Sequence, residues 1–350
     1  MKQAVPQKPA KKLDLNQIIP KLLKKTVRTE MLLDTPLWRQ TPPAAFPVCL
    51  GFLALGVAWQ HAVDVIPWVS EDMSNLLLAA ATGYFLWFFG FYLAKIIARP
   101  AVLLEDMRTP PARAGIAAMA MSMMLLALAL LPFNLYVPQV WWTGVSLQIL
   151  ASAVVLYAIW QDPPKKRHFS TFQYLTFVGP VIGPFTGVPL GYVWQSYWLI
   201  MAALVAYVIV TIGIVLTLKR DPIPKPLRPS IAIFLAPICM FALGFNALGY
   251  DAIFSYFYWA SNVAAVILLI MAPWMMRGGY TPVWGAFTFP LAAYFNIQII
   301  ALAEGYGTVA LVGTYVAMAI GTPMIFYMVY RTVMEWVTGN LAKKSHAATA

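Results

Sequence analysis

The sequence predicts an all-α integral membrane protein built from ten transmembrane helices. Of its 350 residues, 61% are hydrophobic and 11% are charged, whereas soluble domains carry about 25% charged residues. A helix needs about 20 apolar residues to span a bilayer. The expected helices cover residues 45–63, 74–94, 114–132, 141–160, 171–190, 196–218, 229–249, 255–275, 282–303 and 307–330. The chain thus divides into a basic N-terminal tail (1–44), a membrane domain (45–331) and a C-terminal tail (332–350).

The basic residues predict which ends of the helices face the cytoplasm. All 24 Lys and Arg residues lie in the two tails and in alternate loops, and the intervening loops carry only acids, such as Asp64 and Glu304. Short loops that contain Lys or Arg stay in the cytoplasm. We therefore expect a multi-pass protein of the inner (cytoplasmic) membrane, with both termini in the cytoplasm. The net charge of +11 follows from this topology, so membrane lipids are expected partners and nucleic acid is not.

The N-terminal tail has a pattern of its own. Leu and Ile residues between Leu13 and Leu23 interleave with Lys and Arg residues between Lys21 and Arg28. Such a segment forms a short amphipathic structure on an anionic membrane surface, or it is a solvated tail. The sequence leaves both interpretations open.

The expected helices pair into five hairpins, because the connections at 133–140, 191–195, 250–254 and 304–306 are short. Prolines recur in the odd-numbered helices, at Pro47, Pro180, Pro184, Pro237 and Pro290. Proline removes a backbone N–H and kinks a helix. Backbone groups freed at membrane depth are tolerated only against protein or a water-filled cavity. We therefore expect the odd-numbered helices to lie inside the bundle, where their glycines allow close packing or line a pore.

The expected helices contain few side chains that could take part in proton transfer, catalysis or metal binding. No Asp, Glu, Lys or Arg lies within the core of any of them, although proton-coupled carriers and pumps usually place such residues there. An HExxH motif and paired core aspartates are missing, and the three His residues are scattered. We therefore expect no enzyme, no metal site and no cofactor. Thr186, Thr288 and Asn296, in the odd-numbered helices, suit either interhelical hydrogen bonds or the lining of a pore.

Four short runs resemble the tellurite-resistance/dicarboxylate transporter family, which includes the plant guard-cell slow anion channels. They are Phe-Pro-Val-Cys-Leu-Gly at 46–51, Val-Gly-Pro-Val-Ile-Gly at 178–183, the run from Arg228 to Pro237, and Trp-Gly-Ala-Phe-Thr-Phe-Pro at 284–290. Pro180 stands where that family often has Asn, and Thr288 stands where it has Ser. The resemblance covers roughly residues 45–330.

This resemblance implies five helical hairpins in a quasi-fivefold arrangement around a central pore, with the odd-numbered helices as its wall. It also implies a homotrimer with a separate pore in each subunit, and a gating phenylalanine at the position of Phe289. An apolar ring across a narrow lumen gates by excluding water. The other candidates for lining or kinking the pore wall are Phe46, Pro47, Gly51, Pro180, Gly183, Pro184, Thr186, Pro237, Thr288, Pro290 and Asn296.

Three functions fit these observations. The first is an anion channel or channel-like transporter for small inorganic or organic anions, because basic loops concentrate anions and helix N-terminal ends favour negative charge. The second is a substrate-specific carrier or exporter of dicarboxylate, sulfite or tellurite oxyanions. The third is a drug/metabolite exporter with two five-helix repeats. The proline spacing of 57 residues (Pro180 to Pro237) and 53 residues (Pro237 to Pro290) instead suits a two-helix unit.

Overall fold

A computed structural model describes residues 35–161 and 169–350, and every regular element in these ranges is helical. The proposed amphipathic segment of the N-terminal tail lies outside the described residues. Nine helical stretches in the described ranges are long and apolar enough to cross a membrane, as expected for an integral membrane protein. They are Pro43–Ala62, Glu71–Ala98, Pro110–Phe133, Pro138–Gln161, Val193–Arg220, Lys225–Ala247, Asp251–Met276, Pro282–Ala303 and Gly307–Val337.

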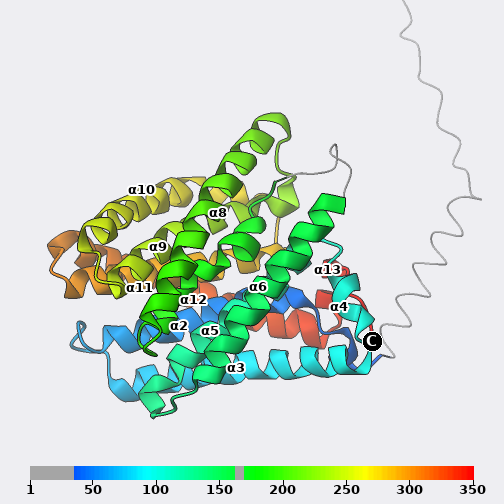
Figure 1. Cartoon of the computed structure of the whole chain (residues 1–350), viewed down its shortest axis with the longest axis horizontal. Helices are drawn as coiled ribbons and strands as arrows, with labels where there is room; N and C mark the ends of the chain where they lie inside the picture. Colours follow the sequence, from blue (N-terminus) through cyan, green and yellow to red (C-terminus); the bar gives the residue numbers. More distant parts are fainter. Residues whose placement is uncertain (1–34, 162–168) are drawn as a thin grey trace, which may run out of the picture.

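These stretches fall into a buried set and an exposed set. The buried set consists of α2 (Phe46–Ala62), α5 (Pro110–Ala129), α9 (Leu235–Ala247) and α11 (Thr288–Ala303), whose stretches are 67% to 83% buried. The exposed set consists of α3 (Glu71–Ala98), α6 (Pro138–Gln161), α8 (Val193–Arg220), α10 (Asp251–Met276) and α12 (Gly307–Val337), with 17% to 33% buried. In Figure 1, α3 and α10 lie on opposite sides of the bundle. The alternation along the chain is the one that the prolines and loops predict.

The buried helices pack against one another in a closed cycle that includes α7 (Ile182–Gly187). Helix α2 contacts α5 and α11, α7 contacts α5 and α9, and α9 contacts α11. Each also packs against the exposed helix that follows it in the chain, which gives the pairs α2–α3, α5–α6, α7–α8, α9–α10 and α11–α12. The chain therefore forms five hairpins with their first members inside.

The fifth expected helix, at 171–190, is not one continuous α-helix. It consists of a π-helix η5 (Tyr174–Val178), a 3-10 turn η6 (Gly179–Val181) and the short α7. Pro180 and Pro184 cannot donate backbone hydrogen bonds. The Gln148 amide on α6 compensates, because its Nε2 donates to the carbonyls of Leu175 at 2.9 Å and Thr176 at 2.8 Å.

Prolines begin the inner α-helices rather than kinking them, which corrects an expectation from the sequence. Pro47 is the second residue of α2, Pro237 the third of α9 and Pro290 the third of α11. Backbone N–H groups in a first turn have no partner within the helix, so proline costs little there. Short 3-10 helices precede these starts, namely η2 (Pro43–Ala45), η7 (Lys225–Phe234) and η8 (Pro282–Phe287).

A buried ion pair anchors the end of the bundle where the inner helices begin. Lys95, in the last turn of α3, donates to Asp106 Oδ2 at 2.9 Å and to the carbonyl of Thr41 at 3.0 Å. Asp106 ends α4 (Ala101–Asp106), and its Oδ1 accepts the backbone N–H of Ala348 at 2.7 Å. The C-terminal segment, with α13 (Asn340–Ser345), is thereby fixed to this end of the bundle.

Candidate functional site

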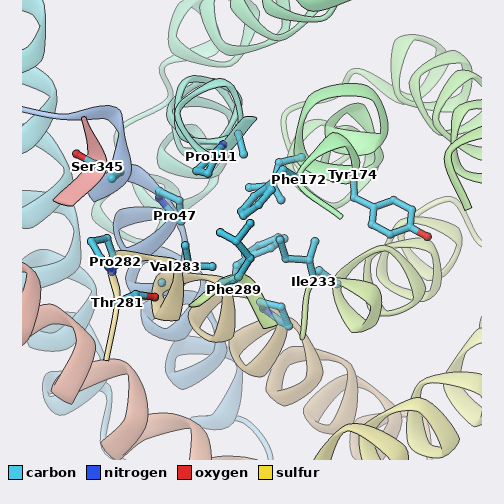
Figure 2. A pocket seen from close by; sticks show the side chains of 18 of the residues that line it. Pro47, Pro111, Phe172, Tyr174, Ile233, Thr281, Pro282, Val283, Phe289 and Ser345 are labelled. Atoms are coloured by element: carbon cyan, nitrogen blue, oxygen red, sulfur yellow. The ribbon is translucent and has the colours of Figure 1, made fainter. Parts of the chain in front are cut away.

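A cavity of about 500 Å³ lies inside the cycle of buried helices. All five inner segments contribute to its wall, as do loops and the C-terminal segment (Figure 2). The wall residues from the inner segments and their leading turns are Ala44, Pro47, Thr109, Pro111, Ala114, Met121, Phe172, Tyr174, Leu175, Val178, Gly179, Val181, Ile233, Ala236, Pro237, Met240, Gly285, Ala286, Phe289 and Pro290. At one end the cavity is bordered by Pro226, Thr281, Lys344, Ser345 and His346.

The wall is apolar and carries no acidic side chain among its described residues. Its basic side chains are Lys344 and His346, both exposed. Lys344 bonds to Glu335 Oε1 at 2.7 Å, and its ammonium lies 5.7 Å from the centre of the Tyr280 ring. Burial raises the pKa of the Tyr280 phenol, so this ring stays neutral beside the cations. The bordered end of the cavity is therefore basic.

The first turns of the inner helices converge on this cavity. Pro47 of α2, Pro111 of α5, Pro237 of α9 and Phe289 of α11 each lie in the first turn of their helix and in the cavity wall. The N-terminal end of an α-helix carries a partial positive charge of about half an elementary charge. Four such ends around one apolar space favour a negatively charged occupant.

Phe289 points into the cavity toward the same space as Phe172 (Figure 2). Its side chain is buried, with 6% of the residue surface exposed. The neighbouring Thr288 fixes the backbone at this point, because its Oγ1 lies 2.9 Å from the carbonyl of Pro47 and 2.7 Å from that of Gly285. The Tyr174 ring points away from the centre (Figure 2), and its hydroxyl lies 2.7 Å from Thr211 Oγ1. Phenylalanine rings thus occupy the middle of the cavity.

Four of the residues singled out from the sequence come together in this wall, namely Pro47, Pro237, Phe289 and Pro290. The remaining candidates lie at contacts between helices. Phe46 packs its ring against Phe85 and Tyr92 of α3. Gly51 faces Thr288, where an added Cβ would lie 2.4 Å from the Thr288 Cβ.

The candidates of the fifth segment face neighbouring helices in the same way. A Cβ at Gly183 would lie 2.6 Å from Leu199 on α8, and the Pro184 ring lies 3.4 Å from the Cβ position of Gly244 on α9. Thr186 accepts a hydrogen bond from Trp141 Nε1 on α6 at 2.9 Å. Pro180 is half-buried and is not a cavity residue, although Gly179 and Val181 beside it are. Asn296 lies on α11 two turns beyond Phe289 and bonds to α2.

Sequence reasoning missed several wall residues, above all Phe172, Met121, Ile233 and Met240. Each is an apolar side chain in a chain that is apolar nearly throughout, so no pattern separates a lumen contact from ordinary packing. In residues 35–161 and 169–350, no three His, Cys, Asp or Glu side chains group as a metal site requires. The site is therefore an apolar cavity with a basic border.

The comparison with known families decides the identity of this helical bundle. The family model described as voltage-dependent anion channel matches residues 40–334, which include the whole cycle of buried helices and their partners. The chain belongs to the voltage-dependent anion channel family. This confirms the resemblance that the four sequence runs carry. The members of this family are transporters and channels that move anions across membranes.

The chain is also similar to the tellurite resistance protein TehA homolog of Haemophilus influenzae. The two are 24% identical over 314 residues, which cover 87% of this chain and 93% of the relative. The match therefore extends over nearly the whole length of both proteins. It agrees with the multi-pass membrane architecture that the family indicates.

Proposed function

We propose that the protein conducts small inorganic or organic anions through a central pore gated by Phe289. The pore runs between the five inner segments, which form a quasi-fivefold wall with the fifth segment broken. One observation carries this proposal. The first turns of the long inner helices and the Phe289 ring meet at the same apolar cavity.

The cavity selects for anions because helix N-terminal ends border it and the wall residues that the structure describes include no acid. Each end favours a nearby anion by roughly 0.3–1 kcal/mol, and more where the site is shielded from water. Lys344 and His346 border the same space, and the basic loops raise the anion concentration at that mouth. The Pro47 carbonyl, which would favour cations, is bonded to Thr288 Oγ1 at 2.9 Å.

Phe289 acts as the gate because its apolar ring points into the cavity that the inner segments enclose. A hydrated anion cannot pass an apolar ring without losing water, and the ring offers no compensating hydrogen bond. Passage requires the ring to turn aside. The neighbouring Phe172 narrows the same level of the cavity (Figure 2).

The proposed setting is the inner membrane, with both termini and the basic mouth in the cytoplasm, as the distribution of Lys and Arg predicts. The proposed assembly is a homotrimer in which each chain contains its own pore. Residues from all five inner segments of one chain line the cavity, which supports separate pores. Apolar residues such as Trp87, Ile97 and Ile270 are exposed on the outer helices and suit contact with lipid or a neighbouring subunit.

A substrate-specific exporter of oxyanions is the second candidate, favoured by the name of the tellurite resistance relative. Its transport would saturate with substrate concentration, whereas channel current would follow the anion gradient. Exchange of chloride, nitrate, sulfite, tellurite and malate in proteoliposomes separates the two. The drug/metabolite exporter finds less support, since the five two-helix hairpins give no division into two five-helix halves.

Single-channel recording in planar bilayers tests the gate. We expect Phe289→Ala to increase chloride current clearly above that of the wild type. The matched control is Phe287→Ala, which removes the same ring from η8 at a place that packs against Trp284, 5.8 Å between ring centroids, outside the cavity. Absence of anion current in all three proteins would reject the channel, and an equal rise in both variants would reject the gate.

A further inference from the structure

His61 and Phe185 form a ring contact between two inner segments, and neither residue belongs to the cavity wall. The imidazole of His61 lies against the Phe185 ring, with 5.9 Å between centroids and an interplanar angle of 78°. His61 is in the last turn of α2 and Phe185 is in α7. These helices are not neighbours in the cycle, where α2 contacts α5 and α11. The contact therefore joins two inner segments that are not adjacent in the cycle.

The positions along each helix agree with this placement. His61 follows Pro47 by 14 residues and Phe185 follows Val181 by four, which are spacings that keep side chains on one helix face. Pro47 and Val181 are cavity residues. Asn296 likewise follows Phe289 by seven residues, which is about 10 Å along a helix. His61, Phe185 and Asn296 thus form a second level of the lumen beyond the proposed gate.

Asn296 fixes the orientation and the tautomer of the imidazole. Its Nδ2 donates to the carbonyls of Ala54 and Ala292, each at 2.9 Å, so its Oδ1 is the atom left to accept. That oxygen lies 3.3 Å from His61 Nδ1, which must therefore carry the proton in the neutral ring. The other ring nitrogen, Nε2, can then bind a proton and donate a hydrogen bond.

Among the titratable groups near the second level, His61 is the one that becomes a cation when it binds a proton. Asp64, in the loop after α2, interacts with it electrostatically. Helix α7 has no titratable residue, and in α11 the Tyr294 hydroxyl bonds to Asn262 at 2.8 Å. Glu304, beyond α11, accepts from Asn246 at 3.4 Å, and Glu71 and Asp72 lie in the first turn of α3. His61 itself is partly exposed, whereas Asn296 is 1% exposed.

We propose that His61, positioned by Asn296, is a binding site for a small monovalent anion at the far end of the pore, occupied when the imidazole is protonated. Protonation turns Nε2 from an acceptor that repels an anion into a charged donor that binds one. The site rests on the proposed function in that the pore leads to it. It makes anion passage depend on the pH of the solution at that end, with passage favoured at low pH and lost as the pH rises.

Nitrogen-15 NMR of the full chain labelled at histidine tests binding directly. The chain has three His residues, His61, His168 and His346, so the loss of one signal in His61→Gln assigns it. We expect sodium nitrate to shift the His61 signal saturably at pH 5.5, and binding to be at least about tenfold weaker at pH 8, because only the protonated ring carries the charge that binds an anion. An unresponsive His61 signal at pH 5.5 would overturn the proposal.

Two variants distinguish the positioning of the His61 ring by Asn296 from a general effect of substitution on the structure. Asn296→Ala removes the acceptor, so the neutral His61 ring should show a mixture of tautomers and weaker nitrate binding at an unchanged fold. His346→Gln, at the other end of the cavity, should leave the His61 titration as it is. If both variants alter the His61 signal equally, the assignment of the site is wrong.

Chloride efflux from proteoliposomes then connects the site to transport. In the Phe289→Ala background we expect efflux to increase as the pH at the His61 end is lowered from 8 to 5.5, and His61→Gln to abolish that increase. Equal pH profiles with and without His61 would contradict the inference. Absence of efflux from Phe289→Ala itself would reject the proposed function, whereas the NMR titration would still decide whether His61 binds anions.

Discussion

Lys95 Nζ donates to Asp106 Oδ2 at 2.9 Å, and neither side chain exposes any surface. Tyr92 donates to the same carboxylate oxygen at 3.3 Å, and Ala348 donates its backbone N–H to the other oxygen at 2.7 Å. One carboxylate thereby joins α3, α4 and the C-terminal segment. The segment that borders the cavity is held in place by a charge that water cannot reach.

We expect Asp106→Asn to destabilise the protein by about 3–5 kcal/mol, because Lys95 is left buried without an opposite charge. Thermal unfolding of the purified protein in detergent measures this loss. The control is Glu105→Gln, which removes the acid of a half-exposed pair with Arg99 and should cost less than about 1 kcal/mol. Equal losses of stability in the two variants would show that the buried ion pair contributes no more than the half-exposed pair.

The hydroxyl of Thr288 should hold the backbone that carries Phe289. We expect Thr288→Val to lower stability by about 1–3 kcal/mol, because the buried carbonyls of Pro47 and Gly285 lose their partner, and to raise the open probability of the pore. Thr288→Ser keeps the hydroxyl and should resemble the wild type in both measurements. Wild-type bilayer currents in Thr288→Val would show that the Thr288 hydroxyl has no role in gating.

The contact between α2 and α11 leaves no room for a side chain at Gly51. An added Cβ would lie 2.4 Å from Thr288 Cβ and 2.7 Å from its backbone carbon. We expect Gly51→Ala to cost about 1–3 kcal/mol through overpacking. Gly90→Ala on α3 is the matched control, since a Cβ there meets nothing within 4 Å and alanine favours the helix. Thermal unfolding compares the two, and equal melting temperatures would contradict the close contact.

Lys344 should raise anion current through the basic mouth. In the Phe289→Ala background we expect Lys344→Gln to lower chloride current at low ionic strength and to have little effect in high salt, where surface charges are screened. Lys343→Gln removes the adjacent charge, which does not border the cavity, and should change the current less. Bilayer recordings at two salt concentrations decide this, and a salt-independent loss would point to a structural role instead.

The arrangement of the helices was accessible from the sequence because topology leaves strong signals. Loop charges and short connections defined the hairpins, and the positions of Pro47, Pro237 and Pro290 marked the inner helices. The role of these prolines was predicted wrongly, since they begin helices that 3-10 turns precede. Sequence periodicity does not show where a 3-10 helix passes into an α-helix, because both bury the same apolar residues.

The residues that line the cavity could be predicted only partly from the sequence. Phe289, which lies in the cavity wall, was singled out through a family resemblance, whereas Phe172 and Met121 carry no signal that separates them from packing residues. The break at Gly179 depends on Gln148, 31 positions earlier in the chain, which bonds to the freed carbonyls. The contact between His61 and Phe185 joins helices that the order of hairpins does not make neighbours, so only three-dimensional structure could show it.

The glycine contacts have a consequence for how flow is regulated. Even a methyl group has no space at Gly51, Gly179 or Gly187. The inner helices are therefore packed too tightly to shift relative to one another and widen the pore. In the proposed channel, anion flux is therefore set by individual aromatic side chains that rotate within a rigid helical wall. In such a channel, substitution of one aromatic residue would change the pore diameter and leave the packing of the helices unchanged.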